Sequence, residues 1–527
     1  MTYTPSRYLA LLALALETMT LSAQSTHRVA PAQVVPQNWH RHYSDSLQGM
    51  RSDEALQWLI QRYGRPRTIL VGVVDTGVDT TLTALRPSLW LNPKERPNGL
   101  DDDRDGYVDN RYGWNFLGSQ DGSLELTSVG TEAYREYKRL YPKYKDITTA
   151  PAGFEEEWNY FREMERKTGI QKYRRLYTHT VAKDSAYRLL DAHLRQLSGA
   201  RYDSLQLSAL DSLPLEGKAL EEAGELIGAD LAKAGGEALW VKVFATHRTR
   251  LEQMEKRLSG IEYDLDKRTL LGDRMEDVQD RHYGNANVSA PGADHGTFVS
   301  SVIALQSQPD SPLAGVYPAA RLINIRAVPD QGDEYDKDVA SAIYYAVQQG
   351  AKVINLSLGK DLSPSADLVR SALDWAAKRD VVIVHSSGNN GRDLDAAPIY
   401  PEGVGRSGKP LANYLRIGAS TKLGTRASFS NYGKSVTLCA PGQEIYGLMA
   451  GGRTSQEEGT SIAAPLTAAV AAMIRAYFPR LTAPQVVEIL HTTARQGQVP
   501  IVDALAAVQR AAKLSHRHPT HTASKRK

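Results

Sequence analysis

The stretch Gly459-Thr460-Ser461-Ile462-Ala463-Ala464-Pro465 decides how the rest of the chain is interpreted. It is followed at once by an apolar run, Leu466 to Tyr477, which predicts a buried helix. Small residues around a serine at a helix start leave its hydroxyl accessible. They also let a substrate carbonyl approach the free N–H groups of the first turn. A serine at this place can equally be a helix N-cap, so a role as nucleophile requires partners elsewhere in the chain.

An apolar, β-branched run upstream ends in an aspartate. Residues 68–74 read Thr-Ile-Leu-Val-Gly-Val-Val, and Asp75-Thr76-Gly77 follows. Such a run predicts a buried parallel strand with Asp75 at its carboxyl edge. In open α/β sheets ligands bind at that edge, although an Asp there can also be a turn residue or a cap.

A histidine precedes a second apolar helical pattern. His295-Gly296-Thr297 stands before the apolar face that runs to Ala304, which places the imidazole at a helix start. An isolated His of this kind is more often structural or exposed than functional. Strands and helices then alternate, which predicts a parallel sheet with right-handed crossovers. The expected strands are 321–328, 352–358, 381–386, 415–419 and 435–440, and the expected helices are 338–349, 366–378, 484–490 and 502–512.

Together, these motifs resemble those of the subtilisin-like serine peptidases. Val-Val-Asp-Thr-Gly-Val-Asp around Asp75, His-Gly-Thr at His295 and Gly-Thr-Ser-Ile-Ala-Ala-Pro at Ser461 stand in the family's chain order Asp, His, Ser. Val353-Ile-Asn-Leu-Ser-Leu-Gly359 resembles the family's strand that pairs with the substrate backbone. Ser386-Ser-Gly-Asn-Asn-Gly391 resembles its loop with the oxyanion asparagine. The resemblance covers roughly residues 68–119 and 288–512.

The resemblance implies a fold and a set of roles. The fold is α/β, a three-layer subtilisin-like domain with a mostly parallel sheet flanked by helices. Ser461 is the implied nucleophile, His295 the base that returns its proton to the leaving amine, and Asp75 the group that fixes the imidazole. The Asn389 amide and the Ser461 N–H are the implied oxyanion donors. The implied substrate-binding residues, an edge to which an extended peptide adds, are Ser357, Leu358, Gly359 and Gly388.

Two features depart from the family pattern. Phe298, Ser300 and Ser301 replace the usual second His and the Ala-Gly that follows, at positions that pack the helix. A stretch over 120–287 separates Asp75 from His295, and tyrosines recur in it at helical spacing among many charged residues. We expect a mostly helical insertion there and hypothesise that it gates the cleft or recruits substrate. No inhibitory prodomain of the familiar kind is evident.

Residues 98–116 are rich in aspartate. Aspartates at alternate positions followed by Gly106 have the spacing with which a tight loop wraps oxygen ligands around Ca²⁺. The twelfth loop position is Tyr112 and no helix pair flanks the loop, which argues against an EF-hand. An acidic solvated turn is the other interpretation. We expect a structural Ca²⁺ and no cofactor for catalysis; the expected ligands are Asp101, Asp103, Asp105 and Asp109.

The N-terminus resembles a secretory signal peptide. Arg7 precedes the apolar run Leu9 to Leu16, and Leu21-Ser22-Ala23 offers a cleavage site near Ala23. The run is too short to span a bilayer in a mature protein, and no later stretch looks transmembrane. We therefore expect an exported protein, secreted or periplasmic, with no membrane span.

Composition limits the remaining possibilities. The net charge of +3 does not point to nucleic acid, so we expect protein or peptide substrates and no nucleic-acid partner. The single cysteine, Cys439, excludes an intrachain disulfide and a multi-thiolate metal site. The expected division is signal peptide 1–23, N-terminal arm 24–66, catalytic α/β domain 67–119, helical insertion 120–287, second part of the catalytic domain 288–514 and basic disordered tail 515–527.

The leading interpretation is an exported serine endopeptidase that works through an acyl-enzyme. The alternative is a catalytically silent peptide-binding or regulatory protein on a subtilisin-like scaffold, its cleft masked by the insertion. The presence of all three catalytic residue types argues against that alternative. An acyltransferase or esterase is a third interpretation, since the same triad serves any acyl group.

Overall fold

The computed structural model describes residues 36–65, 67–213, 217–263, 267–275 and 277–516. The expected signal peptide and residues 517–527 of the expected tail lie outside the described residues. All elements below belong to the compact unit that begins at Gln37.

A seven-stranded, wholly parallel sheet organises the α/β domain, as expected from the alternating strands and helices. Its order is β11-β10-β9-β8-β3-β6-β4. The consecutive large-sheet strands β6 and β8 lie on opposite sides of β3, so the strand order reverses there and the carboxyl end of β3 is the expected ligand edge. The strands are β3 (Ile69–Asp75), β4 (Gly113–Asn115), β6 (Ala320–Arg326), β8 (Val353–Leu356), β9 (Val382–Ser386), β10 (Tyr414–Ser420) and β11 (Leu438–Pro441).

The register of three strands fixes what stands at this edge. Strand β3 pairs with β6 along its whole length, and Asp75 lies opposite Arg326. On the other side, β3 pairs with β8 up to Val74 opposite Leu356. Ser357 follows Leu356 directly. Asp75 and the expected substrate-binding residues 357–359, called the substrate segment below, therefore lie at the same edge of the sheet.

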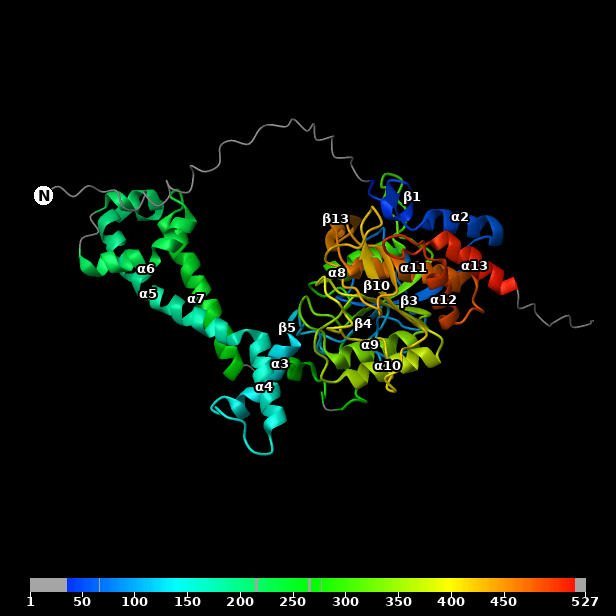
Figure 1. The fold of residues 1–527 in the computed structure, drawn as a ribbon, viewed down its shortest axis with the longest axis horizontal. Coiled ribbons are helices and arrows are strands. Elements are labelled where there is room, and N and C mark those ends of the chain that lie inside the picture. The colour runs from blue at the N-terminus through cyan, green and yellow to red at the C-terminus, as the bar shows by residue number, and fades with distance from the viewer. Residues whose placement is uncertain (1–35, 66, 214–216, 264–266, 276, 517–527) are drawn as a thin grey trace, which may run out of the picture. The chain divides into compact units, whose positions relative to one another are not determined.

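Helices cover the two faces of the sheet, which gives the three layers (Figure 1). Helices α9 (Asp336–Gln348) and α10 (Ala366–Lys378) pack on one face, and α8 (Asp294–Ala304) and α11 (Thr460–Tyr477) pack on the other. Among the described helices, only α11 is long and apolar enough to cross a membrane, but 89% of that window is buried in the fold. The helix is therefore a core helix, as the apolar run predicted.

The remaining elements of the α/β domain surround this core. Helices α12 (Ala483–Thr493) and α13 (Ala504–His516) follow α11, and β12 (Ile445–Leu448) pairs with β13 (Thr454–Glu457) beside α8. Residues 43–48 form a two-stranded ribbon of β1 (Tyr43–Ser44) and β2 (Leu47–Gln48), and α2 (Ser52–Tyr63) packs against α13.

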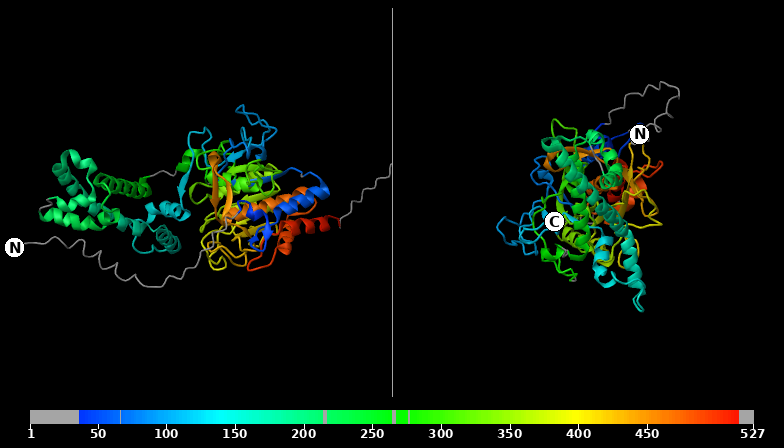
Figure 2. Two further views of the ribbon diagram at one scale, coloured as in Figure 1. Left: turned by 90° about the horizontal axis from the view of Figure 1, so that it is seen from above. Right: turned by 90° about the vertical axis from the view of Figure 1, so that its left-hand side faces the viewer.

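The segment between β4 and α8 is mostly helical, as expected (Figures 1 and 2). It holds two separate hydrophobic cores. Tyr137 and Tyr144 belong to one core, whereas Tyr187 and Trp240 belong to the other. The tyrosine stripes are therefore helix-packing faces. The helices are α3 (Glu132–Tyr144), α4 (Glu155–Thr168), α5 (Ile170–Ser198), α6 (Lys218–Ala234) and α7 (Trp240–Tyr263).

Both ends of the insertion contact the segment that follows β6. Strand β5 (Ser128–Gly130) pairs in parallel with β7 (Gln331–Gly332). Tyr335 lies three residues beyond β7. The guanidinium of Arg135 lies 4.1 Å from the centroid of its ring, and the guanidinium of Arg268 lies 4.2 Å from it. Cations this close to an aromatic ring are attracted to its π-face. One tyrosine of the α/β domain thus binds arginines from both ends of the insertion.

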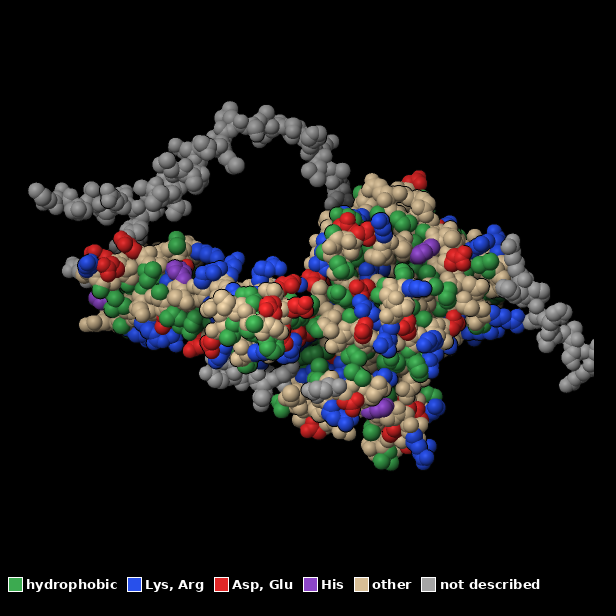
Figure 3. All heavy atoms as spheres, turned by 60° about the horizontal axis from the view of Figure 1, so that its bottom comes forward, with side chains coloured by type: hydrophobic (Ala, Val, Ile, Leu, Met, Phe, Trp, Pro, Cys, Tyr) green, Lys and Arg blue, Asp and Glu red, His purple; other side chains and the backbone are tan. Residues whose placement is uncertain are grey.

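Charged side chains of both signs are interspersed over the face drawn in Figure 3. The sequence has 63 Lys and Arg residues against 60 Asp and Glu residues. The electrostatics of that face therefore do not single out a polyanion as partner.

Candidate active site

Asp75 and His295 meet at the carboxyl edge of the sheet. Asp75 is the last residue of β3 and is 1% exposed, and His295 is the second residue of α8. Asp75 Oδ1 lies 2.7 Å from His295 Nδ1 and also accepts the Thr76 N–H at 2.7 Å. A carboxylate bound to Nδ1 keeps that nitrogen protonated, so the neutral imidazole presents Nε2 as its base.

The residues after His295 explain why the imidazole is held there. The Gly296 N–H donates to Thr76 Oγ1 at 3.0 Å, and Thr297 Oγ1 accepts the Asp79 N–H at 2.9 Å. A Cβ at Gly296 would lie 2.1 Å from the carbonyl oxygen of Gly77, so only glycine fits. The His-Gly-Thr motif therefore joins the start of α8 to the turn after β3.

The charge of His295 responds to its neighbours. Burial alone would lower the pKa of His295, but the Asp75 carboxylate and its hydrogen bond raise this pKa above 6.5, with a further contribution from Glu457. The imidazole side chain is 40% exposed, so water screens part of these interactions. The net direction is upward, and the imidazolium is stabilised.

Ser461 and Asn389 face a common small space. Ser461 is the second residue of α11, and Asn389 lies in the loop after β9. Asn389 Oδ1 accepts hydrogen bonds from the Thr460 N–H at 2.8 Å and from Thr460 Oγ1 at 2.9 Å. A Cβ at Gly459 would lie 3.0 Å from Ser461 Oγ and 3.4 Å from Asn389 Nδ2. Glycine at 459 thus leaves open the space that the hydroxyl and the amide nitrogen share.

The base and the hydroxyl stand at the starts of two helices that pack together. Helices α8 and α11 are neighbours on the same face of the sheet. Within the described residues, no hydrogen bond joins Ser461 Oγ to His295. In free enzymes, hydrogen bonds of this kind are often long and tighten only in the complex with substrate. Of the three expected triad residues, Asp75 and His295 are joined by a hydrogen bond, and Ser461 lies at the start of the neighbouring helix.

The expected substrate-binding residues lie beside the serine. Ser357 Oγ donates to the carbonyl oxygen of Ser461 at 2.7 Å and accepts from Asn355 Nδ2 at 2.9 Å. The Gly388 N–H donates to Thr460 Oγ1 at 2.9 Å, and its φ of +91° favours glycine before Asn389. The segment after β8 and the loop after β9 are therefore both tied to the first residues of α11.

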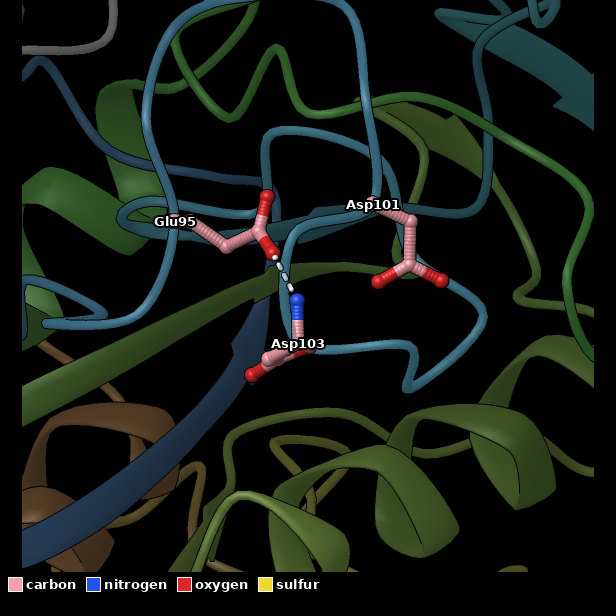
Figure 4. A group of neighbouring side chains, drawn as sticks. All are labelled: Glu95, Asp101 and Asp103. Atoms are coloured by element: carbon pink, nitrogen blue, oxygen red, sulfur yellow. Dashed lines mark hydrogen bonds between the residues drawn. The ribbon is translucent and has the colours of Figure 1, made fainter.

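The acidic loop brings together a different set of potential ligands from the expected one. Potential ligand oxygens of Glu95, Asp101 and Asp103 lie within 4.8 Å of one another (Figure 4). Asp105 and Asp109 do not belong to this group. The Asp109 carboxylate accepts the N–H groups of Asn98 and Gly99, at 3.0 and 2.9 Å.

Asp105 accepts other hydrogen bonds, and Glu95, which the spacing did not predict, takes its place in the group. Asp105 Oδ1 accepts the Tyr107 N–H at 2.9 Å, and Asp105 Oδ2 accepts from the side chains of Asn110 and Gln349. Glu95 accepts the N–H groups of Asp103 and Asp109, both at 3.0 Å. Because Glu95 stands before the Asp-x-Asp-x-Asp-Gly pattern, ligand spacing alone does not find it.

Comparison with known proteins gives the family. The model of the subtilase family matches residues 67–508. The chain is 33% identical over 219 residues to a thermophilic serine proteinase of Bacillus sp. (strain AK1). The matched residues make up 41% of this chain and 50% of that protein. The chain is 32% identical over 190 residues to thermitase of Thermoactinomyces vulgaris, covering 36% of this chain and 64% of that protein. Subtilisin Savinase of Lederbergia lenta is 32% identical over 203 residues, covering 38% and 71%.

This chain therefore spans about half the length of the first of these relatives. The match to the family model includes the strand that ends in Asp75, the helix that begins beside His295 and the helix that carries Ser461. The insertion, residues 120–287, lies inside the matched range. The chain belongs to the subtilase family.

Proposed function

We propose that this chain is an exported serine endopeptidase that hydrolyses peptide bonds through an acyl-enzyme intermediate. The observation that carries the proposal is the 2.7 Å contact between Asp75 Oδ1 and His295 Nδ1. The two residues come from distant parts of the chain and meet at the sheet edge where α/β proteins bind ligands. Membership of the subtilase family and relatives named serine proteinases add to its support.

The proposed reaction uses three side chains in turn. Ser461 Oγ attacks the substrate carbonyl carbon while His295 Nε2 takes the hydroxyl proton, and Asp75 stabilises the imidazolium. The imidazolium gives that proton to the leaving amine, and the acyl group stays on Ser461 Oγ. Water then attacks the ester with His295 again as base, which releases the acid and restores the hydroxyl.

The oxyanion of the tetrahedral intermediate needs donors that are already in place. Within the described residues, Asn389 Nδ2 makes no hydrogen bond, whereas Asn389 Oδ1 is held by Thr460. The amide nitrogen is therefore oriented and available in the space above Gly459. We assign the oxyanion to Asn389 Nδ2 and the Ser461 N–H.

A serine-directed probe tests this proposal. A fluorophosphonate should add to Ser461 Oγ with loss of fluoride, and the intact mass should increase by one adduct. Ser461→Ala should abolish both labelling and proteolysis, whereas Ser407→Ala, on an exposed turn, should retain both. A protein that binds peptides tightly, takes no label and cleaves no protein would instead support the silent peptide-binding interpretation.

The proposed location rests on the N-terminal sequence. Arg7 and the apolar run Leu9 to Leu16 have the features of a secretory signal, and we propose cleavage near Ala23 and export to the periplasm or medium. One relative, 33% identical over 234 residues, is a cell wall-associated protease of Bacillus subtilis (strain 168). N-terminal sequencing of the protein recovered from the producing cell's exterior or periplasm should find a start near residue 24.

We also infer that the acidic loop binds a structural divalent cation, with Ca²⁺ the best fit. Oxygens that share one Ca²⁺ at about 2.4 Å lie no more than about 4.8 Å apart. Glu95, Asp101 and Asp103 meet this limit. The side chain of Asp103 is 6% exposed, and its buried Oδ1 has no hydrogen-bond partner. Burial and the negative charge of Asp103 raise the pKa of Glu95, although its backbone hydrogen bonds act in the opposite direction. A bound cation would relieve the repulsion between the two carboxylates.

A further inference from the structure

The substrate segment leaves the sheet at a well-defined point. Strand β8 pairs with β9 up to Leu356 opposite His385. Two residues later, the carbonyl oxygen of Leu358 lies 2.9 Å from His385 Nε2 and 3.2 Å from Ser386 Oγ. Two side chains of β9 thus hold this oxygen beyond the last backbone pair of the two strands.

The hydrogen bonds of His385 define its tautomer. Burial, with a contribution from Arg416, lowers the pKa of His385 to about 3, so the ring is neutral near pH 7. A carbonyl oxygen only accepts, so His385 Nε2 carries the proton and donates it to Leu358. Nδ1 must then accept, and the hydroxyl of Tyr414 lies 2.5 Å from it.

A second donor frees the tyrosine hydroxyl for this role. Tyr414 Oη also lies 3.1 Å from the carbonyl oxygen of Pro401, which could compete for the same proton. Arg416 donates to that carbonyl oxygen at 2.6 Å. Pro401 is therefore satisfied by the guanidinium, and Tyr414 can donate to His385. The result is a chain of hydrogen bonds, buried at His385 and Leu358, that runs from Tyr414 through His385 to Leu358.

The direction of the Leu358 carbonyl determines to which side the backbone N–H and C=O groups of Ser357 and Gly359 point. Successive peptide groups of an extended chain point to opposite sides. With the Leu358 oxygen turned towards β9, an extended course of residues 357–359 is expected to turn the flanking peptide groups of Ser357 and Gly359 away from β9. That is the side on which an added peptide strand would need donors and acceptors.

We propose that His385 is a positioning residue that sets the hydrogen-bonding edge of residues 357–359 for extended peptides. This inference rests on the proposed function, because it concerns substrate binding at the same site. His385 contacts the substrate segment from the side of β9, opposite the side on which a peptide would bind, and it acts only through Leu358. Its effect should therefore grow with the number of substrate residues that lie along the segment.

Two variants separate the donor from the bulk of the ring. His385→Gln places an amide nitrogen near the position of Nε2, so a donor to Leu358 is retained. His385→Asn places its amide near the position of Nδ1, so that donor is lost. In a Ser461→Ala background, calorimetry should show that the Asn variant binds a tetrapeptide amide about tenfold more weakly than the parent, with Gln restoring most of the affinity.

Catalysis gives a second readout in the background with an intact Ser461. The substrates are a single-residue ester and a tetrapeptide with the same final acyl residue and leaving group. The Asn variant should lower kcat/KM more for the tetrapeptide than for the ester, mainly through KM, and the Gln variant should restore the ratio. Equal loss on both substrates in both variants would overturn the inference.

The two proposals can fail separately. Peptide affinity in the Ser461→Ala background does not depend on catalysis, whereas absent fluorophosphonate labelling of the parent protein would refute only the catalytic proposal. If the Asn variant does not fold, Ser386→Ala removes the other donor to Leu358 at a smaller structural change. Ser386→Ala should weaken tetrapeptide binding about threefold, and unchanged affinity would overturn the inference.

Discussion

Lys360 Nζ lies 2.5 Å from Glu132 Oε2, and this ion pair joins the residue after the substrate segment to the first residue of the insertion's helix α3. The Lys360 side chain is 2% exposed. Its ammonium also contacts Asp336 Oδ1 and the carbonyl oxygen of Glu334, both at 2.9 Å. Burial lowers the pKa of Lys360, but Asp336, Glu132 and Glu334 raise it above its ordinary value. The insertion is therefore coupled to the substrate segment through a buried charge.

Removing one partner of this pair should destabilise the fold. Glu132→Gln leaves Lys360 with Asp336 as its remaining close partner, so we expect the free energy of unfolding to fall by about 2–3 kcal/mol. The double variant Glu132→Gln, Lys360→Met should lose less than the sum of the single variants, because it leaves no uncompensated ammonium. Chemical denaturation measures both effects.

An exposed pair in the same insertion is the matched control. Glu163 and Lys167 form an ion pair with both side chains at least one-third exposed. Glu163→Gln should change the free energy of unfolding by less than about 0.5 kcal/mol. Strictly additive losses at residues 132 and 360 would show that their coupling is negligible.

Glu334 should make stability depend on pH. Burial raises the pKa of Glu334 from 4.5 to about 7, against the opposing effect of Lys360. Because the folded pKa is above the unfolded value, the contribution to stability is full below pH 4.5 and is lost as pH rises through about 7. Relative to the parent, Glu334→Gln should gain about 2–3 kcal/mol between pH 5 and pH 8. A difference that does not change with pH would contradict this assignment.

The activity profile should report His295. Asp75 raises the pKa of His295, and the proposed mechanism needs the neutral imidazole. Activity should therefore increase with pH through a midpoint above 6.5 and fall on the acid side. Asp75→Asn should reduce kcat by several orders of magnitude and move the acid limb of kcat/KM to lower pH. An acid limb that stays in place in Asp75→Asn would show that another group controls it.

Calcium should stabilise the protein through the acidic loop. With Ca²⁺ at about a hundred times its Kd, stabilisation is about 2.7 kcal/mol, which corresponds to an increase of roughly 5–10 °C in Tm. Glu95→Gln and Asp103→Asn should remove this increase, whereas Asp102→Asn, an exposed neighbour that binds Asn98, should keep it. An unchanged Tm under a calcium chelator would contradict the metal site.

The distal half of the insertion can be removed to test its role. One core of the insertion is built from residues of α5–α7 and their connections, whereas Tyr173 and Leu258 each pack against the other core. Replacing about residues 176–255 with a short Gly/Ser linker should leave fluorophosphonate labelling unchanged, since no expected site residue is removed. If the insertion recruits substrate, the deletion should slow cleavage of a folded protein substrate but should not slow hydrolysis of a small ester substrate. Equal rates on both would remove the recruitment hypothesis.

The central strands and the serine helix could be predicted because their signals are local. A buried parallel strand is an uninterrupted apolar run, and β3 is found at residues 69–75 within the expected run. Helix α11 begins at Thr460, six residues before the apolar run used to recognise it, because its first turn is made of the small residues around Ser461. Strand β8 ends at Leu356 and not at Leu358, since the chain leaves β9 at the substrate segment.

The features that could not be predicted depend on tertiary neighbours. Strand β4 contains only Gly113–Asn115 and has no periodic pattern; it forms because Gly113 lies against β6, where a Cβ would be 1.7 Å from the carbonyl oxygen of Asn324. His385 lies in an apolar strand, and nothing in Val-Ile-Val-His-Ser shows that its ring meets Leu358. Glu95 approaches the acidic loop only after the chain folds back.

The contacts of Tyr335 with Arg135 and Arg268 have a consequence for how such a chain can arise. Arginines from both ends of the insertion converge on one ring, so the points of departure and return are close together. A segment that starts and finishes at neighbouring points can lengthen or shorten while the scaffold around it keeps its shape. These helices can therefore be gained or lost as a single block while Asp75 and His295 still meet.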